Sequence, residues 1–152
     1  MAASFVKLDT FLSSDRKYIF SKCQFEFTST TIGDFDQIIL TNTLIGALED
    51  LTDRLNKYKR TTCNSDNVEN EFTAILENNI RNTCLPIGVE NFDGDLAAFF
   101  VIEDVEKMIL KPWGVNTLSF ESISLDQYKN EIAAITIELK NQKRRLTPKL
   151  SY

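Results

Sequence analysis

A repeating apolar pattern near the C-terminus constrains the fold more than any other feature of the chain. Apolar residues recur there at steps of three and four, and they are Leu125, Tyr128, Ile132, Ile135 and Leu139, followed one heptad later by Leu146. This spacing places them on one face of a helix. Ser124 and Gln127 have the spacing of a capping box, which starts a helix. The sequence therefore predicts a long amphipathic helix over residues 125–146, about 33 Å in length.

This helix can use its apolar stripe in two ways. A stripe with such spacing packs either into the core of its own chain or against a second chain. Ile137 lies outside the stripe, one helical turn from Ala133 and Ala134, and together with them would give the helix a second contact surface. The residues of this helix that we expect to contact a partner are Leu125, Tyr128, Ile132, Ile135, Ile137, Leu139 and Leu146.

The charge of the chain changes sign near its C-terminus. All 22 acidic residues precede residue 140, so residues 1–139 carry a net charge of −10 and residues 140–152 carry +5. The basic end of the helix, residues 140–149, includes Lys143, Arg144 and Arg145, which we also expect to contact a partner. Their partner can be the helix dipole, an acidic protein surface or a nucleic acid. Nucleic acid is the least favoured, because the segment has no aromatic residue for base stacking and the rest of the chain is acidic.

Two further helices are predicted in the middle of the chain. Apolar steps of three and four favour helices over residues 36–60 and 67–82. Asp66 and Glu69 have capping-box spacing at the start of the second of these helices.

The segment from Asp95 to Pro112 allows two interpretations. Asp95 can cap a helix that ends before Pro112, because the residue preceding a proline is pushed out of the helical conformation. This helix is the preferred prediction. The stretch 96–102 is wholly apolar, however, and a buried strand is the alternative.

Strand signals are weaker than helix signals. Alternating apolar residues predict strands over residues 17–28, with a β-bulge near Lys22, and over residues 115–123. Residues 4–13 fit either a short helix or an extended segment. We expect a single domain over residues 1–152 with an α+β, helix-dominated fold of about four helices and a small antiparallel sheet. A mostly-α bundle with extended arms is the alternative.

Residue types limit the chemistry that the chain can perform. There is no histidine, which excludes catalysis by an imidazole base, and no glycine-rich phosphate loop. Cys23, Cys63 and Cys84 are too widely spaced for a zinc motif, so we expect free thiols. The acidic clusters, such as Asp93 with Asp95, are better explained by helix capping and solvated surfaces than by metal binding. We expect no catalytic residue, no metal and no cofactor.

Trp113 lies in a Lys-Pro-Trp-Gly turn, where it can cover the edge of the core or anchor a partner. No run reaches the ~18 apolar residues of a membrane span, and the first residues do not resemble a signal peptide. The chain is therefore expected in the cytoplasm, or in a virion, and not in a membrane.

These patterns favour a non-catalytic structural or assembly subunit that acts through protein–protein contacts, as a homo- or hetero-oligomer. Membership of a viral or phage particle would fit this class. The first alternative is an acidic inhibitor or immunity-type protein that masks a basic partner, because a net charge of −10 would steer such a partner. The second alternative is an enzyme that uses carboxylates and a divalent metal ion.

Overall fold

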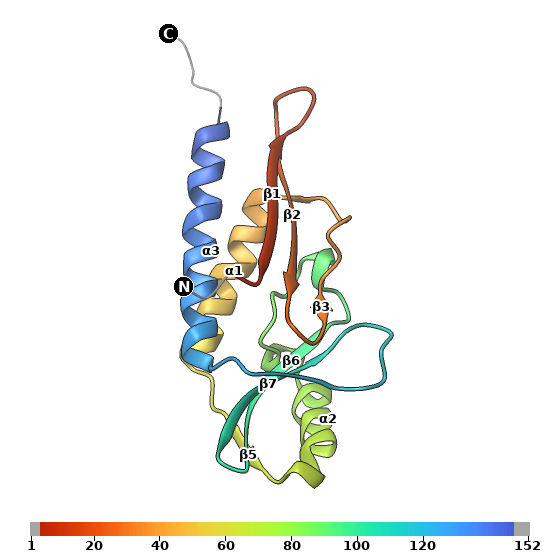
Figure 1. The fold of residues 1–152 in the computed structure, drawn as a ribbon. Helices are drawn as coiled ribbons and strands as arrows, with labels where there is room; N and C mark the ends of the chain where they lie inside the picture. Colours follow the sequence, from red (N-terminus) through yellow and green to blue (C-terminus); the bar gives the residue numbers. More distant parts are fainter. Residues whose placement is uncertain (1–3, 148–152) are drawn as a thin grey trace.

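The computed structural model describes residues 4–147 (Figure 1). These residues form three α-helices and two four-stranded β-sheets, an α+β fold. The helices are α1 (Thr41–Asn56), α2 (Val68–Asn78) and α3 (Leu125–Leu146). The prediction of a helix-dominated fold with about four helices and one small sheet is wrong, and so is its alternative, a mostly-α bundle.

The first sheet contains the strands that precede α1. Strand β1 (Val6–Leu12) pairs antiparallel with β2 (Ile19–Glu26), and β2 also pairs with the short strands β3 (Thr31–Ile32) and β4 (Ile39–Leu40). The β1–β2 register continues through Lys22 without interruption, so the predicted bulge is wrong. The apparent slip in the sequence arises because β2 carries aromatic residues on both of its faces.

The second sheet contains β5 (Thr61–Cys63), β6 (Leu96–Ile102), β7 (Val105–Lys111) and β8 (Ser119–Glu121) in that spatial order. Strand β5 runs parallel to β6, and the other pairs are antiparallel.

The helix predicted between Asp95 and Pro112 is replaced by the β6–β7 hairpin. Both faces of β6 are covered, since Phe99 packs into the main core and Phe100 packs under α2. A strand buried on both faces has an unbroken apolar sequence instead of an alternating one. The hairpin turns at Glu103 and Asp104, which both have positive φ, as a tight two-residue turn requires.

The two helices before this hairpin are shorter than predicted. Helix α1 begins at Thr41 because residues 39–40 join the first sheet instead. Helix α2 follows a short 3-10 turn, η1 (Ser65–Asn67), and no side chain among the described residues caps it, so the predicted capping box is wrong. Two more 3-10 turns precede β6: η2 (Ile80–Asn82) replaces the end of the predicted helix 67–82, and η3 (Glu90–Phe92) follows it.

Helices α1 and α3 lie side by side, and together they cover the main core (Figure 1). This core combines residues of both sheets, among them Phe25 of β2 and Met108 of β7. Stacked and edge-on aromatic rings join the elements, such as Tyr128 of α3 with Phe5 and Phe99. The turn between β1 and β2 and the C-terminal end of α3 lie at one end of the molecule, and α2 lies at the other.

Candidate protein-interaction surfaces

The apolar stripe of α3 belongs to the chain's own core. Five of its members, Leu125, Tyr128, Ile132, Ile135 and Leu139, are buried against α1 and the sheets, whereas Leu146 is only half-buried. The predicted capping box is confirmed: the Ser124 hydroxyl accepts from Gln127 N at 3.1 Å, and Ser124 N donates to the Gln127 side chain at 3.0 Å. The buried residues of the stripe cannot meet a second chain unless the fold opens.

The opposite face of α3 is open to solvent. Ile137 is 62% exposed, and the small residues Ala133 and Ala134 are exposed as well. Of the apolar contact residues predicted on this helix, Ile137 is therefore the one that a partner can reach fully.

The basic end of α3 forms one side of a groove with the start of α1. Lys140, Lys143 and Arg144 line this groove, and Lys140 pairs with Glu49 at 3.4 Å. Lys143, Arg144 and Arg145 form no ion pair with any residue in the range 4–147. The last cation of the basic segment 140–149 is Lys149, which lies outside the described residues.

Trp113 is exposed but firmly supported. Its side chain is 75% exposed, yet its backbone N–H donates to Asp95 Oδ1 at 2.8 Å. The other oxygen of Asp95 accepts from Gly33 N at 2.8 Å, so this carboxylate ties the β7–β8 connection to the turn after β3. A Cβ at Gly94 would lie 2.2 Å from Trp113 Cδ1, which shows that the indole packs directly on the Gly94 backbone.

The sequence predicted that Asp95 caps a helix, and this prediction is wrong. Asp95 instead holds the Trp113 turn through its hydrogen bond to the Trp113 backbone. Burial raises the pKa of this carboxyl, and the charges of Asp34 and Asp93 raise it further against two backbone hydrogen bonds. Asp34 and Asp93 are exposed and form no ion pair within residues 4–147. We call Trp113, Asp34 and Asp93 the Trp113 surface.

A third surface, which was not predicted from the sequence, lies on the outward face of the first sheet. Phe11 of β1 lies directly opposite Phe20 of β2, and Phe20 lies opposite Leu40 of β4, so these three form a row across the sheet. Tyr18 extends the row, with its ring centroid 6.2 Å from that of Phe20. Tyr18 is 53% exposed and Leu40 is 45% exposed. We call Phe11, Tyr18, Phe20 and Leu40 the apolar strip.

Another part of the same sheet face is covered by the chain itself. Lys7 and Lys22 extend over the ring of Phe35, with their ammonium nitrogens 4.2 and 5.7 Å from its centroid. The apolar strip has no comparable cover among the described residues, as the exposure of Tyr18 and Leu40 shows. The sequence could not reveal the strip, because the row depends on which residues of β1, β2 and β4 are paired.

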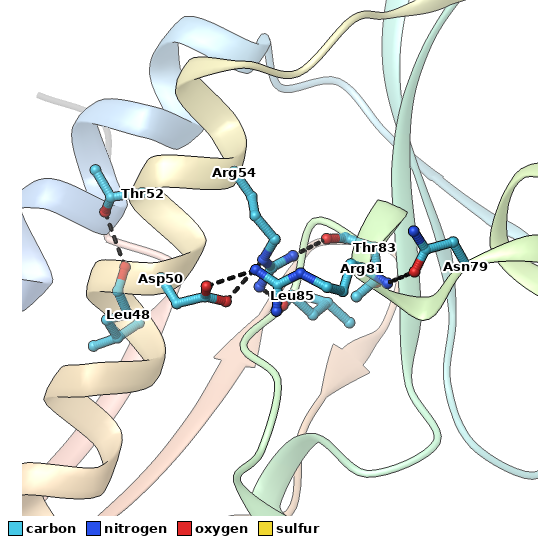
Figure 2. A network of polar contacts seen from close by, with 8 residues as sticks. All are labelled: Leu48, Asp50, Thr52, Arg54, Asn79, Arg81, Thr83 and Leu85. Atoms are coloured by element: carbon cyan, nitrogen blue, oxygen red, sulfur yellow. Dashed lines mark hydrogen bonds and ion pairs between the residues drawn. The ribbon is translucent and has the colours of Figure 1, made fainter.

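A network of half-buried and exposed charges connects α1 to the segment before β6 (Figure 2). Arg54 donates to the backbone oxygens of Thr83 and Leu85 and to Asp50, and Asp50 also accepts from Arg81 at 2.8 Å. Burial raises the pKa of Asp50, but hydrogen bonds and charge from the two arginines outweigh burial and lower it. Each charge thus has a partner, and the network fastens the fold.

The three cysteines are free thiols, as expected. Burial raises the pKa of both Cys23 and Cys84 to about 12, so they remain protonated at neutral pH. Among residues 4–147, no three acidic or cysteine side chains gather in a way that could hold a metal ion.

None of the three helices in residues 4–147 has the length and apolar character needed to cross a membrane. Comparison of the chain with protein-family models, with curated proteins and with solved structures finds no match.

Proposed function

We propose that this protein is a non-catalytic structural subunit that assembles with other copies of itself through the apolar strip. The observation that carries the proposal is the row of Phe11, Phe20 and Leu40 on an outward sheet face, extended by Tyr18. Tyr18 and Leu40 are exposed and Phe11 and Phe20 are half-buried, so the row is an apolar patch open to solvent. Large apolar patches of this kind mark contact surfaces on soluble proteins. Aromatic residues are enriched at the centres of such contacts.

Leu40 gives an independent argument for a contact. It occupies the N-cap of α1 in an extended conformation, and no described side chain caps this helix. Serine, threonine, aspartate or asparagine would stabilise the helix better at this position. The hydroxyl of the next residue, Thr41, is used elsewhere, since it bonds to Ser21 at 2.6 Å. A residue that is unfavourable for local folding, but exposed and apolar, is expected where another surface covers it.

An assembly role also fits the location proposed from the sequence. A subunit of this kind would work in the cytoplasm or within a virus or phage particle. Its contacts would be to protein, and the net charge of −5 disfavours nucleic acid.

Light scattering after size-exclusion chromatography tests the proposal. The experiment is done at about 1 M salt, because charge contacts are then screened beyond roughly 3 Å. The wild type should associate as its concentration rises, because apolar contacts persist in salt. The double variant Tyr18→Thr/Leu40→Asn should stay monomeric. A matched control, Ile80→Thr/Val105→Thr, removes two exposed apolar residues elsewhere and should associate like the wild type.

Two outcomes would overturn the proposal. One is a wild type that remains monomeric up to millimolar concentration. The other is a Tyr18→Thr/Leu40→Asn variant that is folded by circular dichroism and associates as strongly as the wild type.

A further inference from the structure

The Trp113 surface has the features of a preformed contact anchor. The indole is mostly exposed, while its backbone is fixed by Asp95 and one edge of the ring rests on Gly94. An anchor that is already ordered loses little conformational freedom on binding. Two exposed carboxylates, Asp34 and Asp93, lie close enough to Asp95, which holds the Trp113 backbone, for their charges to raise its pKa.

This combination selects a cationic partner. An arginine or lysine placed over a tryptophan ring gains a cation–π interaction within about 6 Å of the ring centre. Adjacent carboxylates would then accept hydrogen bonds from the same cation. Asp36 and Glu90, which lie in the same two turns and are exposed, add negative charge around the anchor.

The same chain carries a surface of matching chemistry. Lys143, Arg144 and Arg145 lie on the last turns of α3, and none of them has an ion-pair partner within the described part of the chain. The end of α3 and the β7–β8 connection are well separated in the molecule (Figure 1), so both can be occupied at once.

We infer that the basic end of α3 in one copy docks onto the Trp113 surface of a second copy. The inference rests on the proposed role as an assembly subunit, and it adds a contact separate from the apolar strip. The two surfaces differ, so the contact is heterologous and propagates head to tail into a ring or a filament. Opposite charges would speed the encounter and make it sensitive to salt.

Two complementary variants test this contact at low salt. Both carry Leu40→Asn, which disables the apolar strip. The basic-end variant adds Arg144→Glu and Arg145→Glu, and the anchor variant adds Trp113→Ala and Asp93→Lys. Each variant alone lacks one half of the contact and should sediment as a monomer. An equimolar mixture should form a dimer and stop there, because the two outer ends of that dimer are the disabled ones.

Trp113 is the sole tryptophan of the chain, so in this mixture the fluorescence comes only from the intact anchor of the basic-end variant. Its emission should shift to shorter wavelength when the anchor variant is added, and the shift should disappear at about 1 M salt. Replacing a tryptophan at the centre of a contact weakens binding by about 30-fold or more. A control carries Leu40→Asn with Lys57→Glu and Lys59→Glu in place of the arginine changes, so it has the same net charge as the basic-end variant. Both halves of its contact are intact, and it should assemble like the Leu40→Asn protein.

Other results would overturn the inference. Two variants that remain separate monomers in the mixture, with unchanged emission, would show that no such contact exists. The Trp113 emission could instead stay unchanged when the anchor variant is added but shift when a lysine- and arginine-rich peptide is added. That result would assign the Trp113 surface to a different basic protein. Because the apolar strip is disabled in both chains, failure here is distinguishable from failure of the proposed strip contact.

Discussion

Replacing Leu40 with alanine and, separately, with asparagine should separate the stability of the fold from its assembly. Leu40 is 45% exposed, so either change loses roughly half of the ~1.5–3 kcal/mol that a fully buried leucine contributes. That loss is about 1 kcal/mol. Asparagine can accept a hydrogen bond from the first turn of α1, where no described side chain does so now, and is better than alanine there by about 1 kcal/mol.

Leu40→Ala should therefore lower the free energy of unfolding by about 1 kcal/mol, whereas Leu40→Asn should leave it close to the wild-type value. For a chain of this length the difference between the variants corresponds to about 2–4 °C in Tm. Thermal unfolding followed by circular dichroism measures it, at a protein concentration low enough that association adds no stability.

Association should respond differently, because both variants remove the same side chain from the apolar strip. They should lose self-association to the same extent at high salt, although their stabilities differ. Equal stability of the two variants would refute the capping argument. Wild-type association by either variant would refute the claim that Leu40 lies in a contact.

Three further predictions concern the supports of the fold and of the Trp113 turn. Asp95 has a raised pKa in the folded state, so the stability it contributes is present below about pH 4 and is lost as pH rises through the raised value. Asp95→Asn should flatten this part of the stability–pH profile, measured by urea unfolding. Gly94→Ala combines a positive φ with a clash against Trp113, so it should cost about 1–2 kcal/mol and make the indole easier to quench with acrylamide. Arg54→Lys should lower the free energy of unfolding by about 2 kcal/mol, because lysine cannot reach Asp50 and two backbone oxygens together. Arg81→Lys changes a more exposed ion pair and should lower it by less than about 1 kcal/mol in the same assay.

Helix α3 could be predicted from the sequence with its limits, because its signals are local. Ser124 and Gln127 mark its start, and the apolar steps repeat within one continuous segment. The sequence could not show what covers the stripe, since periodicity is the same for a core helix and for a contact helix. The structure places that stripe in the core and leaves Ile137 outside.

The hairpin over residues 96–111 could not be distinguished from a helix by its local pattern. Its central residues are buried on both faces, so the alternation that normally identifies a strand is missing. Its strand conformation is stabilised by pairing with β5, which is distant in sequence, and with β8, which follows the next connection.

The candidate contact surfaces depend on similar long-range pairing. Phe11, Phe20 and Leu40 become neighbours only when β1, β2 and β4 pair. Trp113 could be singled out from the sequence as a candidate anchor, but its support could not, because Asp95 joins it to Gly33 across the fold.

Hydroxyl-radical footprinting of the wild type at low and at high protein concentration, in about 1 M salt, tests the assembly claim most directly. It reports the solvent exposure of individual side chains, and Tyr18 and Ile80 are about equally exposed in the single chain, at 53% and 52%. Self-assembly through the apolar strip predicts that Tyr18 becomes protected as the concentration rises while Ile80 does not. Unchanged oxidation of Tyr18 in a sample that is associated by light scattering would contradict it.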